Sequence, residues 1–366
     1  MASNVESIKA YHATSDFGNR EGLDKAKQHV AACYRSLNAN ETRSLIQFAL
    51  QHVDSDEDTA EVYLEHLACF QSGCLAELHL QLLDHKFLKP SVAFAEANEE
   101  VSKRLVRRIE DFAIDDALRA LGWIGDAAAQ QAFATWRENP PHWASQIEWD
   151  WHDYCELGGW QLTQDGANRV LTLHQCYPLV RDLPNEFAAD FMQTNIDHAD
   201  QCQWCRRTLT TLFTLNTFDQ RLRSIPFKGR VLNITTCDVC TCYGQVFTSV
   251  GTDGTSRWFG ENKVPEFLPD NGDTWQRLQP NILKPSQELR DPMESASWFM
   301  PINFSQVGGQ PTWVQYPEYP TCPKCESKMM FIAQLDRGDC EESGEGIYYS
   351  FLCTGCQITA TTFQQS

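Results

Sequence analysis

Apolar residues in the first third of the chain recur at the spacing of amphipathic helices. The first run has members three or four positions apart: Leu23, Ala26, Val30, Cys33 and Leu37. Such spacing places side chains on one helix face, and it also predicts helices over residues 60–70, 74–83, 99–112 and 115–121. Asn40 is the expected N-cap of the helix that follows the first run. We therefore expect a helical domain over residues 21–140, ended by Pro140 and Pro141, after a polar, loosely held N-terminus over residues 1–20.

The pattern changes from about Leu171 onward. Short runs of β-branched and aromatic residues now alternate with turns such as the one at residues 251–254, which is typical of strands joined by tight turns. Residues 260–300 hold several prolines and few periodic apolar positions, and we expect them to form a long connection. The sequence thus predicts an α+β protein in which a mostly β domain over residues 171–366 follows the helical one.

Aromatic residues are concentrated between these two regions, over residues 141–170. They are Trp143, Trp149, Trp151, Tyr154 and Trp160. A cluster of this kind can form a ligand cage or a stacking platform for bases. Its neighbours are Asp and Glu in place of Arg and Lys, which favours a seam or linker where two domains pack.

Four Cys-x2-Cys pairs stand out in the β region, and they form two matched sets. The first set is Cys202, Cys205, Cys237 and Cys240, and the second is Cys322, Cys325, Cys353 and Cys356. Counted from the second cysteine of each set, Leu215-Asn216 and Leu335-Asp336 fall at the same offset. Two pairs at the ends of a hairpin supply the four thiolates that close a tetrahedron on zinc. We therefore expect two zinc ions, with Cys242 competing with Cys240 as a ligand in the first set.

The distribution of histidines decides what kind of zinc site to expect. All ten histidines lie at or before His198, so both sites must be all-thiolate. A closed four-thiolate site has no open coordination position, so it stabilises structure and does not activate water. The β-rich flanks also differ from the strand-to-helix setting of a redox Cys-x2-Cys motif. Two structural zinc ions are therefore expected, in preference to catalytic zinc, redox cysteines or disulfides.

Charge is distributed unevenly along the chain. Residues 1–200 carry 32 acidic and 16 basic residues, which accounts for −16 of the net charge of −19. An acidic surface repels phosphate backbones and attracts basic proteins. The N-terminus lacks the apolar stretch of a signal peptide, and no run approaches about 18 apolar residues. We therefore expect a cytoplasmic protein that binds neither nucleic acid nor membranes, with cysteines that serve as ligands and buried thiols.

Residues 113–136 resemble the short HEAT-like repeat of bacterial solenoids. In this resemblance an apolar ridge is formed by Ala117, Leu118 and Leu121. Gly122 and Gly125 supply the tight turn, and Asp126 is the N-cap of the second helix. The resemblance implies stacked helix pairs with a broad surface.

A second resemblance covers residues 305–325 and the run F-I-A-Q-L-D that follows. It is similar to the YwqG-like bacterial proteins and to the zinc-binding domain of the programmed cell death protein 2 family. Both carry a Gly-Gly-x-Pro-x-Trp turn before an apolar strand, represented here by Gly308, Gly309, Pro311, Trp313, Gln334 and Leu335. The resemblance implies a pseudo-duplicated, mostly β domain without known catalytic residues. The eukaryotic family is implicated in escorting a newly made ribosomal protein.

No phosphate-binding loop, nucleophile elbow or His-Glu-x-x-His motif occurs in the sequence. We therefore expect a non-catalytic protein that binds a basic protein, most concretely an immunity-type inhibitor of a basic toxin. The alternatives are a chaperone of a basic ribosomal protein and an enzyme with its site at the aromatic seam. Candidate contact residues are Asp54, Asp56, Glu57 and Asp58 in the helical half and Trp313 in the β half.

Overall fold

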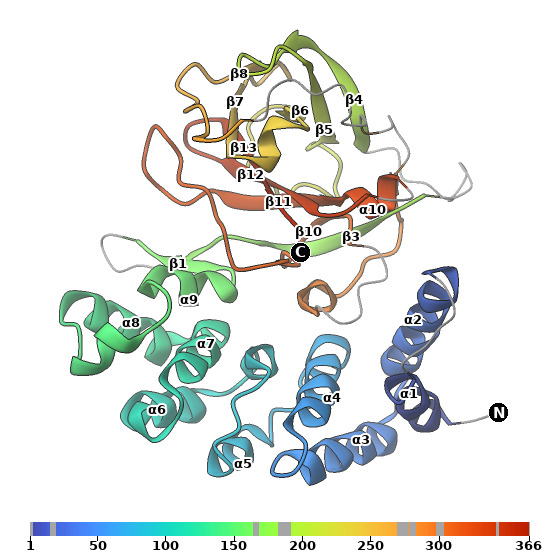
Figure 1. Ribbon diagram of the computed structural model, residues 1–366, viewed down its shortest axis with the longest axis vertical. Helices are drawn as coiled ribbons and strands as arrows, with labels where there is room; N and C mark the ends of the chain where they lie inside the picture. The colour runs from blue at the N-terminus through green and yellow to red at the C-terminus, as the bar shows by residue number, and fades with distance from the viewer. Residues whose placement is uncertain are drawn as a thin grey trace. The chain divides into compact units, whose positions relative to one another are not determined.

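The computed structural model describes residues 3–14, 20–163, 168–181, 192–268, 278, 283–297, 304–341 and 344–365. The chain forms two compact units. Unit 1 comprises residues 1–169 and 293–302, and unit 2 comprises residues 170–292 and 303–366. Helices dominate the N-terminal part of the chain and antiparallel strands the remainder, so the predicted α+β class is confirmed (Figure 1).

Unit 1 is built from short helices that pack on their neighbours in the chain. The α-helices are α1 (Asn4–His12), α2 (Arg20–Arg35), α3 (Ala39–His52), α4 (Glu57–Phe70), α5 (His79–Asp84), α6 (Glu99–Arg107), α7 (Ile114–Ile124), α8 (Ala127–Glu138) and α9 (Trp151–Leu157). The 3₁₀-helices are η1 (Ser91–Phe94), η2 (Ile109–Asp111), η3 (His142–Gln146) and η5 (Pro292–Ala296). Among the described residues, none of the helices combines the length and apolar character needed to cross a bilayer.

Two helix starts differ from the sequence-based prediction. Residues 4–12 were expected to be loosely held, but they form α1, where Ser3 and Glu6 make a capping box and Ile8 is fully buried. The N-cap of α3 is Asn38 and not Asn40, because Glu41 lies three residues after Asn38 and completes a second capping box. Reciprocal side-chain bonds satisfy two backbone N–H groups at each start.

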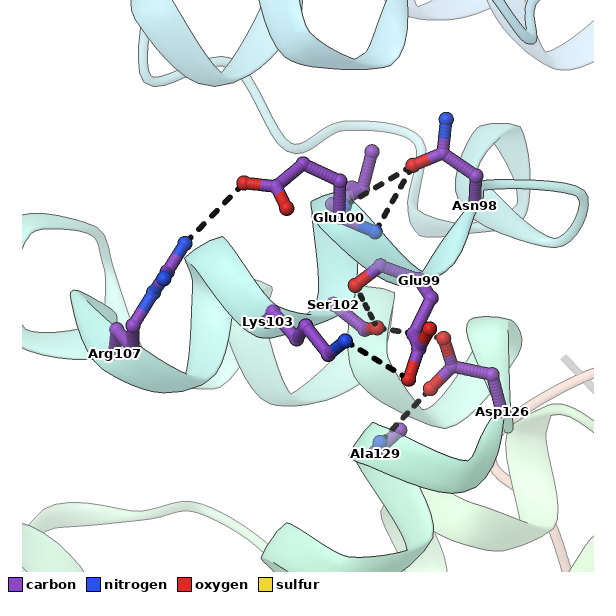
Figure 2. A network of polar contacts seen from close by, with 9 residues as sticks. Asn98, Glu99, Glu100, Ser102, Lys103, Arg107, Asp126 and Ala129 are labelled. Atoms are coloured by element: carbon purple, nitrogen blue, oxygen red, sulfur yellow. Dashed lines mark hydrogen bonds and ion pairs between the residues drawn. The ribbon is translucent and has the colours of Figure 1, made fainter.

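The α6–α8 region holds the segment with the HEAT-like resemblance. Its predicted apolar ridge is fully buried: Ala117, Leu118 and Leu121. Gly125 ends α7 with a φ of 55°, and Asp126 caps α8 by accepting a hydrogen bond from the Ala129 N–H at 2.9 Å. The same carboxylate accepts a bond from Ser102 Oγ at 2.6 Å, which ties α6 to the start of α8 (Figure 2). Gly122 lies within α7 and not in the turn.

The aromatic segment expected to be a seam or linker belongs to the core of unit 1. Trp143, Tyr154 and Trp160 are buried there against α7 and α8. Close approach of backbones explains this packing, because a Cβ on Gly122 would lie 1.9 Å from the Tyr154 carbonyl oxygen. Trp160 Nε1 also donates to the Gly122 carbonyl at 2.7 Å. Residues 141–163 therefore complete the helical unit.

A segment from the second half of the chain also folds with unit 1. In η5, the Glu294 carboxylate accepts hydrogen bonds from Arg35 Nε at 2.8 Å and from its terminal nitrogen at 2.6 Å. Ser297 Oγ donates to the buried carboxylate of Glu65 at 2.9 Å. The expected long connection over residues 260–300 therefore includes a docked segment, while residues 269–277, 279–282 and 298–300 lie outside the described residues.

The strands of the chain fall into three sheets. They are β1 (Trp160–Leu162), β2 (Asn168–Val170), β3 (Leu173–Val180), β4 (Met192–Gln201), β5 (Thr208–Asn216), β6 (Val231–Thr236), β7 (Val246–Val250), β8 (Ser256–Trp258), β9 (Lys284–Pro285), β10 (Gln306–Gly309), β11 (Met330–Asp336), β12 (Ile347–Cys353) and β13 (Ile358–Gln364). Within the described residues the sheet orders are β1-β2, β8-β7-β13-β12-β11-β10-β3-β9 and β4-β5-β6. The larger two sheets share one apolar core in unit 2, to which Phe213 and Tyr348 both contribute.

Unit 2 contains a structural repeat, β4-β5-β6 and β10-β11-β12. In both copies the fifth residue after the second cysteine opposes the residue just before the third cysteine: Thr210 with Thr236, and Met330 with Leu352. Both hairpins carry a bulge seven residues after the second cysteine, at Leu212 and Ile332. Asn195 in β4 and Gly308 in β10 hold equivalent positions and have φ values of 53° and 73°. The matched cysteine spacing in the sequence therefore reflects repeated backbone geometry.

The Gly-Gly-x-Pro-x-Trp motif has a structural role beside β11. Gly308 and Gly309 lie in a bulge where β10 meets β3, and a Cβ on Gly308 would lie 1.9 Å from the Gln175 carbonyl oxygen. Gln334 accepts a hydrogen bond from the Thr312 N–H at 2.9 Å and donates to the Phe304 carbonyl at 2.6 Å. These contacts hold the segment after β10 against the sheet.

Two histidines, the buried His66 and the partly buried His12, predict that unit 1 loses stability in mild acid. Burial lowers the pKa of His66 to about 3 and that of His12 to about 4, from an ordinary value of 6.5. Between pH 6.5 and 4 the unfolded chain binds more protons than the folded protein does. The stability that depends on keeping these two histidines neutral is therefore complete above pH 6.5 and is lost as the pH falls. At pH 5 each histidine should cost about 2 kcal/mol of unfolding free energy.

Urea unfolding at pH 7 and pH 5, followed by helical circular dichroism, measures this loss. The variant His66→Phe should lose about 2 kcal/mol less than the parent between the two pH values. His142→Gln is the matched control, because His142 is exposed on the same unit. Equal losses in the parent and in His66→Phe would contradict the prediction.

Candidate metal centres

The structure brings the eight predicted cysteines together as two groups of four. Cluster 1 is Cys202, Cys205, Cys237 and Cys240, and cluster 2 is Cys322, Cys325, Cys353 and Cys356. The sulfur atoms within each cluster lie within 4.8 Å of one another. Each cluster joins the turn before a hairpin to the turn after it, across β5 and β6 in cluster 1 and across β11 and β12 in cluster 2.

Sulfur–sulfur distances in both clusters match metal coordination. The Sγ atoms of Cys202 and Cys240 are 3.8 Å apart, and those of Cys205 and Cys237 are 3.5 Å apart. In cluster 2 the Cys325–Cys353 distance is 3.6 Å. A tetrahedral ion with bonds of about 2.3 Å to sulfur separates its ligands by about 3.8 Å, whereas a disulfide bond is about 2.05 Å long. The clusters are therefore compatible with two metal ions.

Local backbone geometry turns the cysteines toward each other. In three of the four turns the residue after the second cysteine adopts a positive φ: Arg206, Glu326 and Gln357. The N–H of that residue donates to the carbonyl of the first cysteine at 2.9 Å in every case. The turn at Cys237 uses a 3₁₀-helix instead, η4 (Cys240–Cys242). The left-handed residue closes each turn, so both thiols point to one side.

The structure settles the competition between Cys240 and Cys242. Cys240 belongs to cluster 1, while the Cys242 sulfur lies 3.5 Å from the Asp238 carbonyl and 3.9 Å from the Tyr348 hydroxyl. Burial raises the pKa of the Cys242 thiol to about 12. Cys242 is thus a partly buried packing thiol outside cluster 1. It helps pack the Cys237 turn onto the core, where Tyr348 also donates a bond to the Asp238 carbonyl at 2.6 Å.

The thiols of each cluster affect one another's pKa values in a way that favours binding of a cation. Burial raises the pKa of Cys325, but hydrogen bonds from Ser327 and from the neighbouring thiols outweigh it and hold the pKa at about 6. Hydrogen bonds from Cys202 and its neighbours lower the pKa of Cys205, while the same neighbours raise the pKa of Cys237. In cluster 1 the pKa values of Cys202 and Cys205 are thus lowered and those of Cys237 and Cys240 raised, so ionisation of some thiols opposes ionisation of the others. A divalent cation removes this opposition by binding all four sulfurs.

The predicted contact residues of the acidic half have mixed roles. Asp56 caps α4, since its carboxylate accepts bonds from the Thr59 N–H at 3.3 Å and from its hydroxyl at 2.7 Å. Asp54 lies 3.1 Å from His85 Nδ1 in an exposed ion pair. Glu57 and Asp58 are exposed in the first turn of α4. Only the last two of these four acids are therefore available as surface charges without a local structural partner in the described contacts.

Two further acids, which the sequence reasoning missed, adjoin them. Glu61 is half-buried on α4, and burial raises its pKa; the nearby Lys89 cation opposes this rise, and repulsion from Asp58, Asp116 and Glu57 adds to it. Asp116 comes from the first turn of α7, more than fifty residues later in the chain. The helix packing therefore builds an acidic patch of Glu57, Asp58, Glu61 and Asp116, which no linear run of charge reveals.

Trp313, the predicted anchor of the β half, is a packing residue. Its ring lies 4.7 Å from Tyr349 and 5.2 Å from Tyr319, measured between ring centroids. It packs with Phe351 against the apolar cluster beside cluster 2. Trp313 is thus partly buried in the aromatic packing of unit 2, and its role as a contact residue stays a prediction.

A small cavity in unit 1 brings a thiol, an imidazole and a carboxylate into one lining. The residues are Cys74, His79 and Glu96, and the cavity volume is about 10 Å³. Such a volume holds about one water molecule. Burial raises the pKa of Cys74 to about 12, and His79 Nε2 is engaged with the Ala93 carbonyl at 2.8 Å. This thiol is therefore not activated as a nucleophile.

The fold and these clusters define a two-unit α+β protein with two tetracysteine centres. The chain is 35% identical over 341 residues to the uncharacterized protein YpfL of Salmonella typhimurium, an alignment that covers 91% of this chain and 79% of the relative. It belongs to the same family as that protein. No family model matches the chain, and no solved structure matches it.

Metal analysis of the full-length protein tests the two clusters separately. We expect two metal equivalents per chain, because both clusters provide four converging sulfur atoms. Cys237→Ser and Cys353→Ser should each lose one equivalent, whereas Cys242→Ser, the matched control, should keep both. A loss of metal in Cys242→Ser would contradict the assignment of cluster 1, and a parent protein free of metal would contradict both clusters.

The same substitutions should weaken unit 2 more than unit 1. Metal binding in small tetrahedral sites contributes roughly 10–16 kcal/mol to folding, and a whole domain is stable by only about 5–15 kcal/mol. In Cys353→Ser we expect amide hydrogens of β11, β12 and β13 to exchange as in an unfolded chain, while α3 to α8 stay protected. Unchanged protection of these strands would show that the cluster is incidental to the fold.

Proposed function

We propose that this protein is a non-catalytic, cytoplasmic, zinc-stabilised protein-binding protein. The observation that carries the proposal is the presence of two closed four-sulfur clusters at the ends of hairpins. Four sulfur ligands in a tetrahedron are typical of zinc or iron, and zinc is the ion without redox chemistry that commonly serves structural sites. Closed coordination leaves no position for substrate or activated water, so the ions stabilise unit 2 and do no chemistry.

The partner surface is the acidic patch of unit 1. Several cations of the unit are already paired with acids, as in Arg104–Asp84, Arg108–Asp111 and Arg119–Glu148, and the cation beside the patch is Lys89, against four carboxylates. Excess carboxylates are therefore left at the patch, where the raised pKa of Glu61 reflects burial and crowded negative charge. A basic protein would relieve this repulsion and would be attracted over long range.

In its most concrete form the protein is an immunity-type inhibitor that occludes a basic toxin. Resemblance of residues 305–335 to the programmed cell death protein 2 family favours a second candidate, a chaperone for a basic ribosomal protein. An enzymatic site at the aromatic segment has less support, because Trp143, Tyr154 and Trp160 are buried in the core of unit 1. The HEAT-like character of unit 1 remains part of the proposal, supported by the buried ridge of α7 and the capped start of α8.

Affinity purification of the full-length protein from its own cells, followed by mass spectrometry, tests the proposal. Enrichment of a basic toxin supports the inhibitor, and enrichment of a ribosomal protein supports the chaperone. If no protein partner is enriched and the purified protein converts a small molecule, both the inhibitor and the chaperone would be contradicted.

Association kinetics with the purified partner should depend on ionic strength. If the acidic patch steers encounter, the association rate should fall by about tenfold from low to physiological salt, with the dissociation rate changing much less. The triple variant Glu57→Gln, Asp58→Asn, Asp116→Asn should associate more slowly than the parent at low salt. Asp54 and Asp56 are left intact, because both have local structural partners.

The matched control removes the same charge elsewhere on unit 1, with Glu77→Gln, Glu138→Gln and Asp150→Asn, all exposed. This control should slow association less than the patch variant does. Association that is indifferent to salt, or equal slowing by the two variants, would discard the patch as the docking surface.

A further inference from the structure

The two cysteine clusters share one backbone plan but differ in what covers them. Their hairpins have the same register and the same bulge position. The difference in the side chains that cover the two clusters therefore does not arise from a different backbone fold. In cluster 1, Cys202, Cys237 and Cys240 are at most 1% exposed, and Cys205 is half-buried. In cluster 2, Cys325 is exposed and Cys356 is half-buried. The structural repeat makes this a like-for-like comparison.

An aromatic pair accounts for the protection of cluster 1. Trp204 stands just before Cys205, and its ring meets that of Trp258 edge to face, with centroids 5.0 Å apart. Leu268 and Val239 pack on the same cluster and extend the apolar cover. Three of the four cysteines are thus buried beneath large apolar side chains, and the fourth, Cys205, is only partly exposed, which restricts access of polar reagents to the sulfur atoms.

Cluster 2 lacks the equivalent tryptophan. The residue just before Cys325 is Lys324, which is exposed, as are Pro323 and Glu326 around it. The Cys325 sulfur therefore lies at the surface, while its neighbour Cys353, 3.6 Å away, is buried. An accessible sulfur beside a second sulfur at this distance is the arrangement that forms a disulfide on oxidation.

We propose that cluster 2 is an oxidant-sensitive metal site, in which a peroxide oxidises Cys325 and Cys353 to a disulfide and releases the metal, while cluster 1 keeps its own. The inference rests on the proposed function, because it requires that both clusters bind zinc. Susceptibility of cysteine to oxidation follows thiolate character and exposure. Zinc binding supplies thiolates in both clusters, so exposure decides between them.

The chemistry is balanced without a further reactant. The Cys325 thiolate attacks one peroxide oxygen, the O–O bond breaks, and a sulfenic acid and hydroxide result. The Cys353 thiolate then attacks the sulfenic sulfur, the S–S bond forms and a second hydroxide leaves. Two thiolates lose two electrons, hydrogen peroxide is reduced to two hydroxide ions that the buffer neutralises, and the metal ion loses two of its four ligands.

The test treats the full-length, metal-loaded protein with hydrogen peroxide in the presence of a chromogenic zinc chelator. One metal equivalent should be released at least about tenfold faster than the other. Peptide mapping of the product should find a disulfide between Cys325 and Cys353. The four cysteines of cluster 1 should still react with a thiol-labelling reagent without prior reduction. Equal release rates, faster release from cluster 1, or release without that disulfide would overturn the inference and leave the proposed function standing.

Exchange of the covering residue provides the matched pair of variants. Trp204→Lys should make cluster 1 release its metal at a rate near that of cluster 2, and Lys324→Trp should slow release from cluster 2. Neither change removes a ligand, so both variants should retain two equivalents before treatment. Release rates unmoved by both changes would overturn the role of the cover. A parent protein that takes up no metal would overturn both this inference and the zinc of the proposed function.

Discussion

Unit 2 depends on the convergence of four thiols at two places. At each place, the turn before a hairpin and the turn after it bring their cysteines together. Without a cation, the raised pKa of Cys237 beside the lowered pKa of Cys205 shows that further thiolates in cluster 1 are disfavoured. A bound divalent ion converts that mutual repulsion into attraction and fixes both turns of the hairpin at once. Because the Cys237 turn also receives the Tyr348 hydroxyl from β12, closing one hairpin supports the core around the other.

Different interactions stabilise the two units, but a segment from between the strands of unit 2 folds as part of unit 1. Unit 1 depends on capped helices and on close backbone packing at Gly122. Its Arg35 and Glu65, however, are paired with Glu294 and Ser297, which come from between strands of unit 2. A partly unfolded unit 2 should therefore loosen the docked segment and reduce, without abolishing, the stability of unit 1.

Local chemistry in the sequence predicted more than long-range packing did. The cysteine spacing identified all eight clustered thiols, and Asp126 and the buried ridge of α7 followed from helix periodicity and capping. The prediction of Asn40 as a cap was wrong, because residue type alone does not separate it from Asn38, whereas the reciprocal bonds with Glu41 do. The aromatic segment was assigned to a seam, since nothing in a linear pattern shows that Gly122 admits the Tyr154 backbone. The patch of Glu61 and Asp116 joins helices far apart in the chain, so only the fold could reveal it.

X-ray absorption at the zinc edge of the full-length protein tests the closed, all-sulfur coordination most directly. The predicted spectrum fits four sulfur neighbours at about 2.3 Å and no nitrogen or oxygen in the first coordination shell. A spectrum that requires a nitrogen or oxygen ligand would mean an open or mixed site. Such a result would contradict the structural role of the clusters and restore catalysis as a function of unit 2.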